Sequence, residues 1–117
     1  MSDIMKKVND RGEVAVLVSY GYGAGWYSWN DNLQMLFDPE IVDYVLYVNE
    51  QGFDSYTKQK MIISKFKSKY PDEYMEGADG LTVKWIAKGT QFRINEYDGN
   101  ESLEYNYDGS WIGARVS

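Results

Sequence analysis

The sequence predicts an α+β fold in which two helices pack on a single antiparallel β-sheet of about five to six strands. Three observations lead to this prediction: a Val-rich apolar run at 13–20, helical periodicity between 39 and 69, and alternating apolar and polar residues from 81 onward. The chain has 117 residues, which is the size of one domain. We expect residues 1–12 to form a flexible N-terminal tail and residues 13–117 to form a single α+β domain.

Two helices are expected in the middle of the chain. In the first, Asp38 can cap the N-terminus, Pro39 suits the first turn, and Gly52 follows as a stop. The second spans 55 to about 69 and ends at Pro71, because the residue before a proline is disfavoured in a helix. The aromatic, Asn-rich segment that precedes both helices matches no element by its pattern.

The last third of the chain predicts an antiparallel meander. Residues 81–86, 92–97 and 102–107 alternate between apolar and polar side chains. An Asp-Gly pair follows each of the last two segments and fits the tight turn of a hairpin. We expect the Val-rich run to be a buried strand that joins this sheet.

The composition excludes several kinds of site. The chain has no Cys and no His, which removes disulfides, Cys/His zinc sites, thiol nucleophiles and Ser-His-Asp triads. We expect no metal site and no cofactor. An enzyme built from this chain would have to work through carboxylates, Tyr, Lys or a metal bound by carboxylates.

The charge is acidic overall and unevenly distributed. A net charge of −6 argues against duplex nucleic acid as a partner. Five lysines between 50 and 70 predict a solvated helix face, whereas 71–117 contains nine acidic against four basic residues. No apolar run approaches the ~18 residues of a membrane span, and the start of the chain lacks the apolar stretch of a signal peptide. These features predict a soluble intracellular protein with no membrane partner.

A glycine-rich loop at 19–26, with the sequence SYGYGAGW, follows the predicted first strand. Alternating glycines let backbone N–H groups point into one concavity, which can bind the oxygens of a phosphate or a carboxylate. The spacing matches neither a dinucleotide-binding fingerprint nor a P-loop. The alternative is a strand end that makes a tight turn beneath packed aromatic rings.

Aromatic residues gather in and just after this loop: Tyr20, Tyr22, Trp26, Tyr27 and Trp29. Such rings can stack on nucleobases, a contact worth about 1–3 kcal/mol per base. They are equally suited to a core or to a subunit interface. The sequence leaves both interpretations open.

Arg93 and Asn95 form a third candidate group. If the apolar residues of their strand face the core, alternation places both side chains together on the opposite face. Arg93 offers a planar fork for a phosphate, and Asn95 offers both a donor and an acceptor. Arg115, near the C-terminus, is expected to add a second guanidinium. The alternative is cross-strand pairing of Arg93 with Glu104 or Glu96.

Three carboxylates flank the hairpin turn that is expected near residue 98, namely Glu96, Glu101 and Glu104. A pair of carboxylates can act as acid and base in a glycosidase. Carboxylates beside an exposed hairpin are normally solvated, and this is what we expect here.

Two blocks of the sequence resemble a known family. The first is 19–26 together with Phe37-Asp38, and the second is 89–101, with the sequence GTQFRINEYDGNE. As a pair they resemble the small phage proteins of the first Thoeris anti-defence family, over about Val14 to the C-terminus. Members of that family are sponges that bind glycocyclic ADP-ribose, made by bacterial TIR-domain proteins, without cleaving it.

The resemblance implies a fold, an assembly and a function. The family fold is an antiparallel sheet with helices, assembled as a homodimer or larger oligomer with pockets between subunits. The chain would then be a non-enzymatic phage protein of the host bacterial cytoplasm that withholds a cyclic ADP-ribose-type nucleotide from its effector, blocking Thoeris immunity. Some members also bind cyclic oligonucleotides at other sites. We expect an even-numbered homo-oligomer whose ligand contacts Tyr22, Gly23, Ala24, Gly25, Trp26, Arg93, Asn95 and Arg115.

Two other functions remain open. The acidic last third and the aromatic residues would suit a phage inhibitor that binds a host defence enzyme directly. A carboxylate-based hydrolase of the same nucleotide is the third possibility. A sponge releases intact ligand when it is denatured, whereas a hydrolase leaves product.

Overall fold

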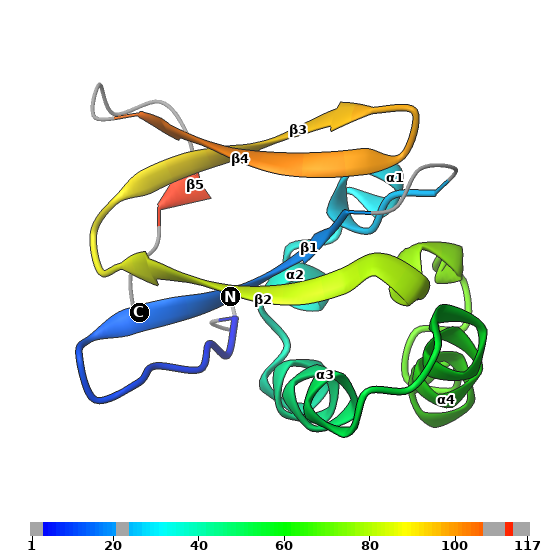
Figure 1. The fold of residues 1–117 in the computed structure, drawn as a ribbon. Coiled ribbons are helices and arrows are strands. Elements are labelled where there is room, and N and C mark those ends of the chain that lie inside the picture. The colour runs from blue at the N-terminus through cyan, green and yellow to red at the C-terminus, as the bar shows by residue number, and fades with distance from the viewer. Residues whose placement is uncertain (1–3, 21–23, 107–111, 114–117) are drawn as a thin grey trace.

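The computed structural model describes residues 4–20, 24–106 and 112–113 and has an α+β fold, as the sequence predicts (Figure 1). Three layers are stacked: the helices α3 and α4, the β1–β2 sheet, and the β3–β4 hairpin. In chain order the elements are β1 (Glu13–Ser19), α1 (Tyr27–Asn30), α2 (Leu33–Phe37), α3 (Pro39–Gln51), α4 (Ser55–Phe66), the 3₁₀ helix η1 (Glu76–Gly80), β2 (Leu81–Ala87), β3 (Gln91–Tyr97), β4 (Asn100–Asn106) and β5 (Ile112–Gly113).

The strands form two small antiparallel sheets, so the prediction of a single sheet of five to six strands is wrong. β1 pairs with β2 from Glu13↔Ala87 to Ser19↔Leu81. β3 pairs with β4, and the two residues of β5 lie on the other side of β3. A turn with Gly89 at a φ of 89° links β2 to β3, and the hairpin folds over the first sheet instead of extending it.

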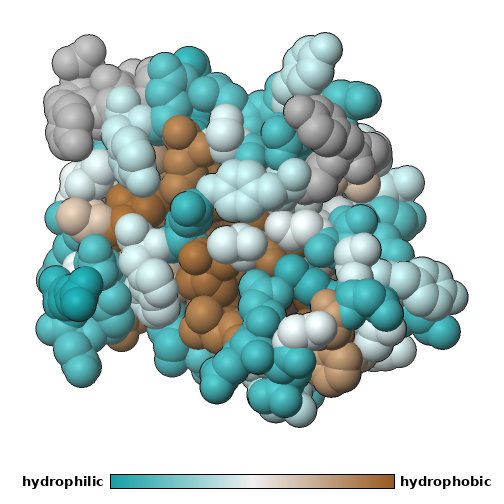
Figure 2. Space-filling view, viewed as in Figure 1, coloured by the Kyte–Doolittle hydropathy of each residue, from teal (hydrophilic) through white to brown (hydrophobic). Residues whose placement is uncertain are grey.

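The apolar character of β1 gives the physical reason for this arrangement. Its residues are buried on both faces, so one covering layer cannot shield them from water. Ala15 and Leu17 pack with buried residues of α3 and α4. Val14, Val16 and Val18 pack with buried residues of α2 and β3. In Figure 2, hydrophobic side chains show as a band through the face where β2 lies, with hydrophilic residues around it.

The helices begin where local signals place them. Asp38 Oδ1 accepts from the N–H of Glu40 (2.9 Å) at the start of α3, and Gly52 ends the helix at a φ of 75°. In α4, Asp54 accepts from the N–H of Thr57 (2.7 Å), but the helix ends at Phe66, earlier than expected. The short helices α1 and α2 lie in the segment for which the sequence predicts no element.

Lys58 departs from the solvated face that the lysine-rich segment predicts. Its side chain is buried between α4 and β2, and its Nζ donates to the carbonyl of Leu81 at 2.6 Å. Burial lowers the pKa of Lys58. Lys60 and Lys65 fit the expectation better, because they lie over the rings of Tyr56 and Tyr44 at the surface.

Residues 4–12, expected as part of a tail, run along β1. The N–H of Ala15 donates to the carbonyl of Lys7 at 2.9 Å, and Val8 forms a bridge with Val14. Lys7 Nζ also pairs with Asp43 of α3 at 2.9 Å. In the described part of the chain, no helix combines the length and the apolar character needed to cross a membrane.

Candidate functional site

The glycine-rich loop begins at Ser19 and ends at Trp26, and these two ends, its stems, both bond the carboxylate of Glu101. Glu101 lies on β4, in the hairpin. Glu101 Oε1 accepts from the N–H of Ser19 (2.9 Å). Glu101 Oε2 accepts from the N–H of Trp26 (2.8 Å), and from both the N–H (2.8 Å) and the hydroxyl (2.6 Å) of Ser28. The side chain is fully buried. Backbone N–H groups of Ser19, Trp26 and Ser28 thus converge here, and the anion that they bind is the chain's own carboxylate.

The interpretation of Glu101 as a solvated hairpin carboxylate is therefore wrong. The signal that could have corrected it is strand alternation, because Glu101 shares a face of β4 with Leu103, which is partly buried and packs against the core. Glu96 and Glu101 lie directly opposite each other in the hairpin, and Glu96 Oε2 accepts from the N–H of Gly99 (2.7 Å) and from the indole N–H of Trp29 (3.3 Å). Glu101 is saturated by hydrogen bonds, and Glu104 lies on the opposite face of the strand.

Gly25 and Gly77 permit this close approach. A Cβ on Gly25 would lie 2.3 Å from Ser28 Oγ and 2.9 Å from Trp29 Cδ1. A Cβ on Gly77 would lie 2.4 Å from the carbonyl oxygen of Gly25. Ser19 Oγ adds a hydrogen bond to the carbonyl of Gly77 at 2.8 Å. The loop stem is therefore wedged between β4 and η1, with no room for a side chain at either glycine.

The structure places Trp26 in the core. Its side chain is fully buried, and its indole N–H donates to the carbonyl of Met35 at 3.3 Å. This matches the core-packing interpretation of that ring, and a ligand could stack on it only if the loop moved. Ala24 stands next to Gly25 and is half-buried. Tyr22 and Gly23 lie outside the described residues.

Other aromatic rings are exposed near the loop. Trp29 and Tyr74 are 42% and 46% exposed, and their ring centroids lie 5.0 Å apart at an interplanar angle of 51°. Trp29 Nε1 donates to Glu96 Oε2 at 3.3 Å. Asn30 fixes the backbone of Tyr74, because its side chain accepts from the N–H of Tyr74 and donates to the carbonyl of the same residue.

Arg93 and Asn95 lie on the face of β3 opposite to the buried Phe92, which confirms the prediction of their orientation. Both side chains bond the same oxygen of Glu104: Arg93 Nη2 at 2.7 Å and Asn95 Nδ2 at 2.9 Å. These hydrogen bonds hold the pKa of Glu104 below its usual value. The cross-strand pairing that the sequence offered as an alternative therefore exists, and the face remains open to solvent.

Strand alternation places one further residue on this face, and it is not among the predicted site residues. Tyr97 follows Arg93 and Asn95 at the same spacing, and it is 76% exposed. We call Arg93, Asn95, Tyr97 and Glu104 the outer face of the hairpin. It combines a guanidinium, an amide, an aromatic ring and the carboxylate that pairs with the first two.

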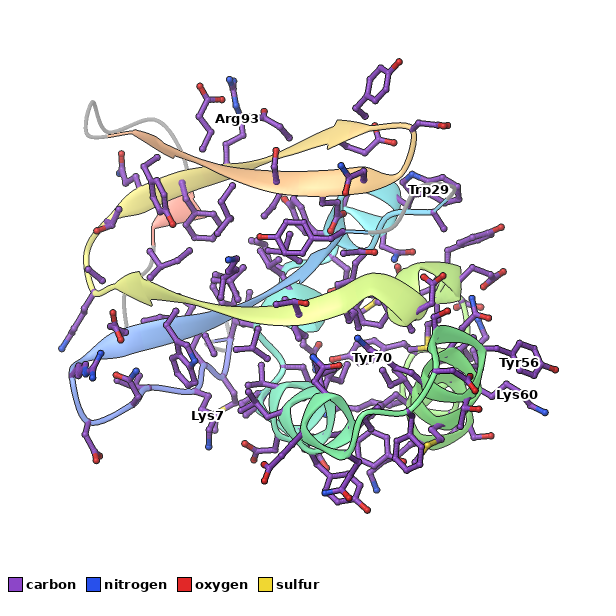
Figure 3. The ribbon with its side chains drawn as sticks, in the orientation of Figure 1. Lys7, Trp29, Tyr56, Lys60, Tyr70 and Arg93 are labelled. Carbon is purple, nitrogen blue, oxygen red and sulfur yellow. The ribbon has the colours of Figure 1, made fainter. Side chains whose placement is uncertain are left out.

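The structure does not bring the two predicted halves of the site together within one chain. Gly25 and Trp26 lie beneath the hairpin, on the side where Glu101 points, whereas Arg93 and Asn95 lie on the outer face. Figure 3 shows Arg93 pointing away from the β1–β2 sheet. Arg115 lies outside the described residues.

A separate cleft of about 310 Å³ lies beside the start of α3, lined by Ile4, Met5, Gln34, Asp38, Pro39, Glu40 and Lys69. Asp38 Oδ2 accepts from the hydroxyl of Tyr70 (2.5 Å) and from Lys69 Nζ (2.9 Å). Burial would raise the pKa of Asp38, but the hydrogen bonds from Tyr70 and Lys69 outweigh it and lower that pKa. Hydrogen bonds to Glu40 and Asp38 raise the pKa of Lys69.

Asp38 was predicted as a helix cap, and those predicted ligand-binding residues that the structure describes do not line this cleft. Its charged groups are already paired with one another. Among the described residues, no group of three or more acidic side chains is placed to hold a metal ion.

No protein-family model, no curated protein and no solved structure matches the chain.

Proposed function

We propose that the protein binds a cyclic ADP-ribose-type signalling nucleotide, glycocyclic ADP-ribose, without cleaving it. By sequestering a signal that bacterial TIR-domain proteins make, it would block Thoeris immunity in the cytoplasm of an infected bacterium. The proposal rests on the sequence resemblance and on one structural observation, the outer face of the hairpin.

The outer face offers the three kinds of contact that such a ligand needs. The Arg93 fork can bind a phosphate. The amide of Asn95 can pair with a base edge or a ribose hydroxyl. The ring of Tyr97 is exposed and can stack on a base. The three side chains follow one another along β3 at the two-residue repeat of a strand.

A second copy of the chain would complete the pocket. A ligand on the outer face would be covered by protein on one side only, whereas a tightly bound small ligand has most of its surface covered. In a two-fold dimer, each pocket can take its second wall from the partner. We therefore expect an even-numbered homo-oligomer with one ligand per chain. Light scattering that shows a tightly binding monomer at micromolar concentration would contradict this part of the proposal.

The test is to incubate the protein with glycocyclic ADP-ribose, heat the mixture, and analyse the released small molecule by chromatography. We expect a thermal shift, since a ligand at a hundredfold excess over its Kd adds about 2.7 kcal/mol to the free energy of unfolding. Intact ligand should be recovered after heating. The absence of binding would refute the proposal, and recovery of a cleaved product would favour a hydrolase.

The exposed Trp29–Tyr74 pair beside Glu96 favours a second candidate, an inhibitor that binds a host defence protein. Aromatic rings are enriched in the cores of protein interfaces, and the last third of the chain is acidic. Capture of one host protein by the purified chain, together with no binding of the nucleotide, would favour this function.

A further inference from the structure

Trp29, Tyr74 and Glu96 come from three segments of the chain and lie together at one edge of the molecule. Trp29 belongs to α1, Tyr74 precedes η1, and Glu96 belongs to β3. Figure 3 shows Trp29 near the turn between β3 and β4. The rings of Trp29 and Tyr74 lie 5.0 Å apart and are 42% and 46% exposed. We call these three residues the acidic aromatic corner.

Hydrogen bonds hold the corner in position. Glu96 Oε2 accepts from the indole N–H of Trp29 (3.3 Å) and from the N–H of Gly99 (2.7 Å). The side chain of Asn30 bonds both backbone groups of Tyr74 and so ties that segment to α1. Because the groups are already anchored in the free protein, a ligand that binds here has little conformational entropy to remove.

The carboxylate of the corner lacks a cationic partner in the described part of the chain. The ion pairs there do not include Glu96. Glu101 lies directly opposite Glu96 in the hairpin, and like charges at such positions repel each other. The hydrogen bonds to Glu101 come from backbone N–H groups and a hydroxyl, which carry no net charge. A cation beside Glu96 would therefore relieve a repulsion that the described residues leave in place.

The sequence around the corner is acidic. The segments that build it, 24–34, 70–83 and 94–106, contain no Lys and no Arg, and all their charged residues are acidic. Two lysines of α4 and its C-terminal end, Lys58 and Lys67, bond the second segment, but both donate to backbone carbonyls. Arg93 lies on the other face of β3 and pairs with Glu104. The charge at the corner therefore disfavours an anion such as a nucleotide and favours a cation.

Aromatic faces beside a carboxylate are suited to one cation above the others. The planar guanidinium of an arginine can stack on a ring face while its N–H groups donate to a carboxylate. The corner offers both contacts, since Trp29 and Tyr74 supply the rings and Glu96 supplies the carboxylate. Trp, Tyr and Arg are also the residues that dominate the binding energy of protein interfaces.

We propose that the acidic aromatic corner binds an arginine side chain of a partner protein, which stacks on the Trp29–Tyr74 pair and donates to Glu96. The assignment of that arginine to a protein rests on the second candidate function. The cation site itself does not, because it can be measured with a peptide. It is also separate from the outer face of the hairpin, where the nucleotide is proposed to bind.

The first test compares two short peptides at low ionic strength, where exposed charges are least screened. One carries two arginines between glycines, and the other carries citrulline, which has the same shape and no charge, in their place. NMR follows the indole N–H of Trp29 and the amide of Tyr74. We expect the arginine peptide to shift both signals to saturation and to bind about tenfold more tightly than the citrulline peptide.

The second test uses variants of the corner. Glu96→Gln removes the charge and keeps an acceptor oxygen for Trp29 and Gly99, and Tyr74→Leu removes one ring. The matched controls are Glu50→Gln on α3 and Tyr56→Leu on α4, since both residues are exposed and lie on other elements. We expect each corner variant to bind the arginine peptide about fivefold more weakly or worse, and each control to bind it as the wild type does. Melting temperatures show that the variants are folded.

The possible failures are distinguishable. Equal binding of the two peptides, or wild-type affinity in both Glu96→Gln and Tyr74→Leu, would overturn the cation site. Tighter binding of spermidine than of the arginine peptide would overturn the assignment to a protein side chain. A protein that binds the arginine peptide but captures no host protein would refute the second candidate function alone, and one that binds the peptide but not glycocyclic ADP-ribose would refute the nucleotide proposal alone.

Discussion

Two glutamates of β4, three residues apart, lie on opposite faces of the hairpin and have opposite surroundings. Glu101 is fully buried and accepts from backbone N–H groups and one hydroxyl. Glu104 has a side chain that is 45% exposed, and it accepts from Arg93 and Asn95. The carboxylate of Glu101 links the two ends of the glycine-rich loop in the interior, and that of Glu104 lies among the side chains proposed to bind ligand.

The difference between the two faces comes from alternation along the strand. Residues on the inner face pack against β1 or bond the loop, so substitutions there should change folding. Residues on the outer face contact solvent and one another, so substitutions there should change binding and leave stability almost unchanged. The following predictions test this separation, from the largest expected effect to the smallest.

The inner face should respond most strongly to Phe92→Ala. Phe92 is fully buried, and its ring meets that of Phe37 edge-on at a centroid distance of 6.2 Å. Removing a buried aromatic ring leaves a cavity, and we expect a loss of about 3–5 kcal/mol in the free energy of unfolding. Urea denaturation measures it. A loss below about 1 kcal/mol would show that the hairpin is not an integral layer of the fold.

The neighbouring residue should behave in the opposite way. Arg93→Ala should weaken binding of the nucleotide by about 1.5–3 kcal/mol, the value of a hydrogen bond to a charged group. The free energy of unfolding should change by no more than about 0.5 kcal/mol, because the side chain is exposed. Calorimetry and urea denaturation give the two numbers. A large loss of stability with unchanged affinity would make Arg93 a structural residue.

A third carboxylate, that of Asp38, allows the same comparison to be made for the stability of the fold at low pH. Asp38 is buried like Glu101 but has a cationic partner in Lys69, and its pKa lies below the usual 3.8. Its contribution to stability is therefore complete above pH 3.8 and is lost as the pH falls through the lowered pKa of the folded state. We expect Asp38→Asn to flatten the fall in the urea midpoint below pH 4. A fall as steep as that of the wild type would contradict this.

Local signals predicted the elements that depend on few neighbours. The cap at Asp38 and the stop at Gly52 are properties of adjacent residues, so the bounds of α3 could be inferred from the sequence. Strand alternation likewise predicted that Phe92 faces the core and Arg93 faces solvent.

What the sequence could not show depends on contacts between distant segments. Alternation says which residues of a strand are buried but not which strand lies beside it, so the split into two sheets was missed. The four-residue helix α1 is held in place by Glu101. This residue bonds Ser28 of the helix, from which it is separated by 73 positions in the sequence. The burial of Trp26 has the same origin, because packing of the loop stem decides which rings enter the core.

Glu104→Gln should have the smallest effect, and it should strengthen binding of the nucleotide, whereas Arg93→Ala should weaken it. Glu104 engages the two side chains that would meet a ligand phosphate or base, and its lowered pKa keeps it ionised at neutral pH. An anionic ligand must therefore compete with it for Arg93. Removing its charge should strengthen binding about twofold to fivefold, since an exposed ion pair is weak and the ligand has little to displace. Glu50→Gln, which removes one negative charge far from the hairpin, controls for the general effect of net charge. Stability should be unchanged in both variants. Weaker binding in Glu104→Gln would mean that the pair holds Arg93 in its binding orientation, and Glu104 would then be a residue that positions the site rather than one that competes with the ligand.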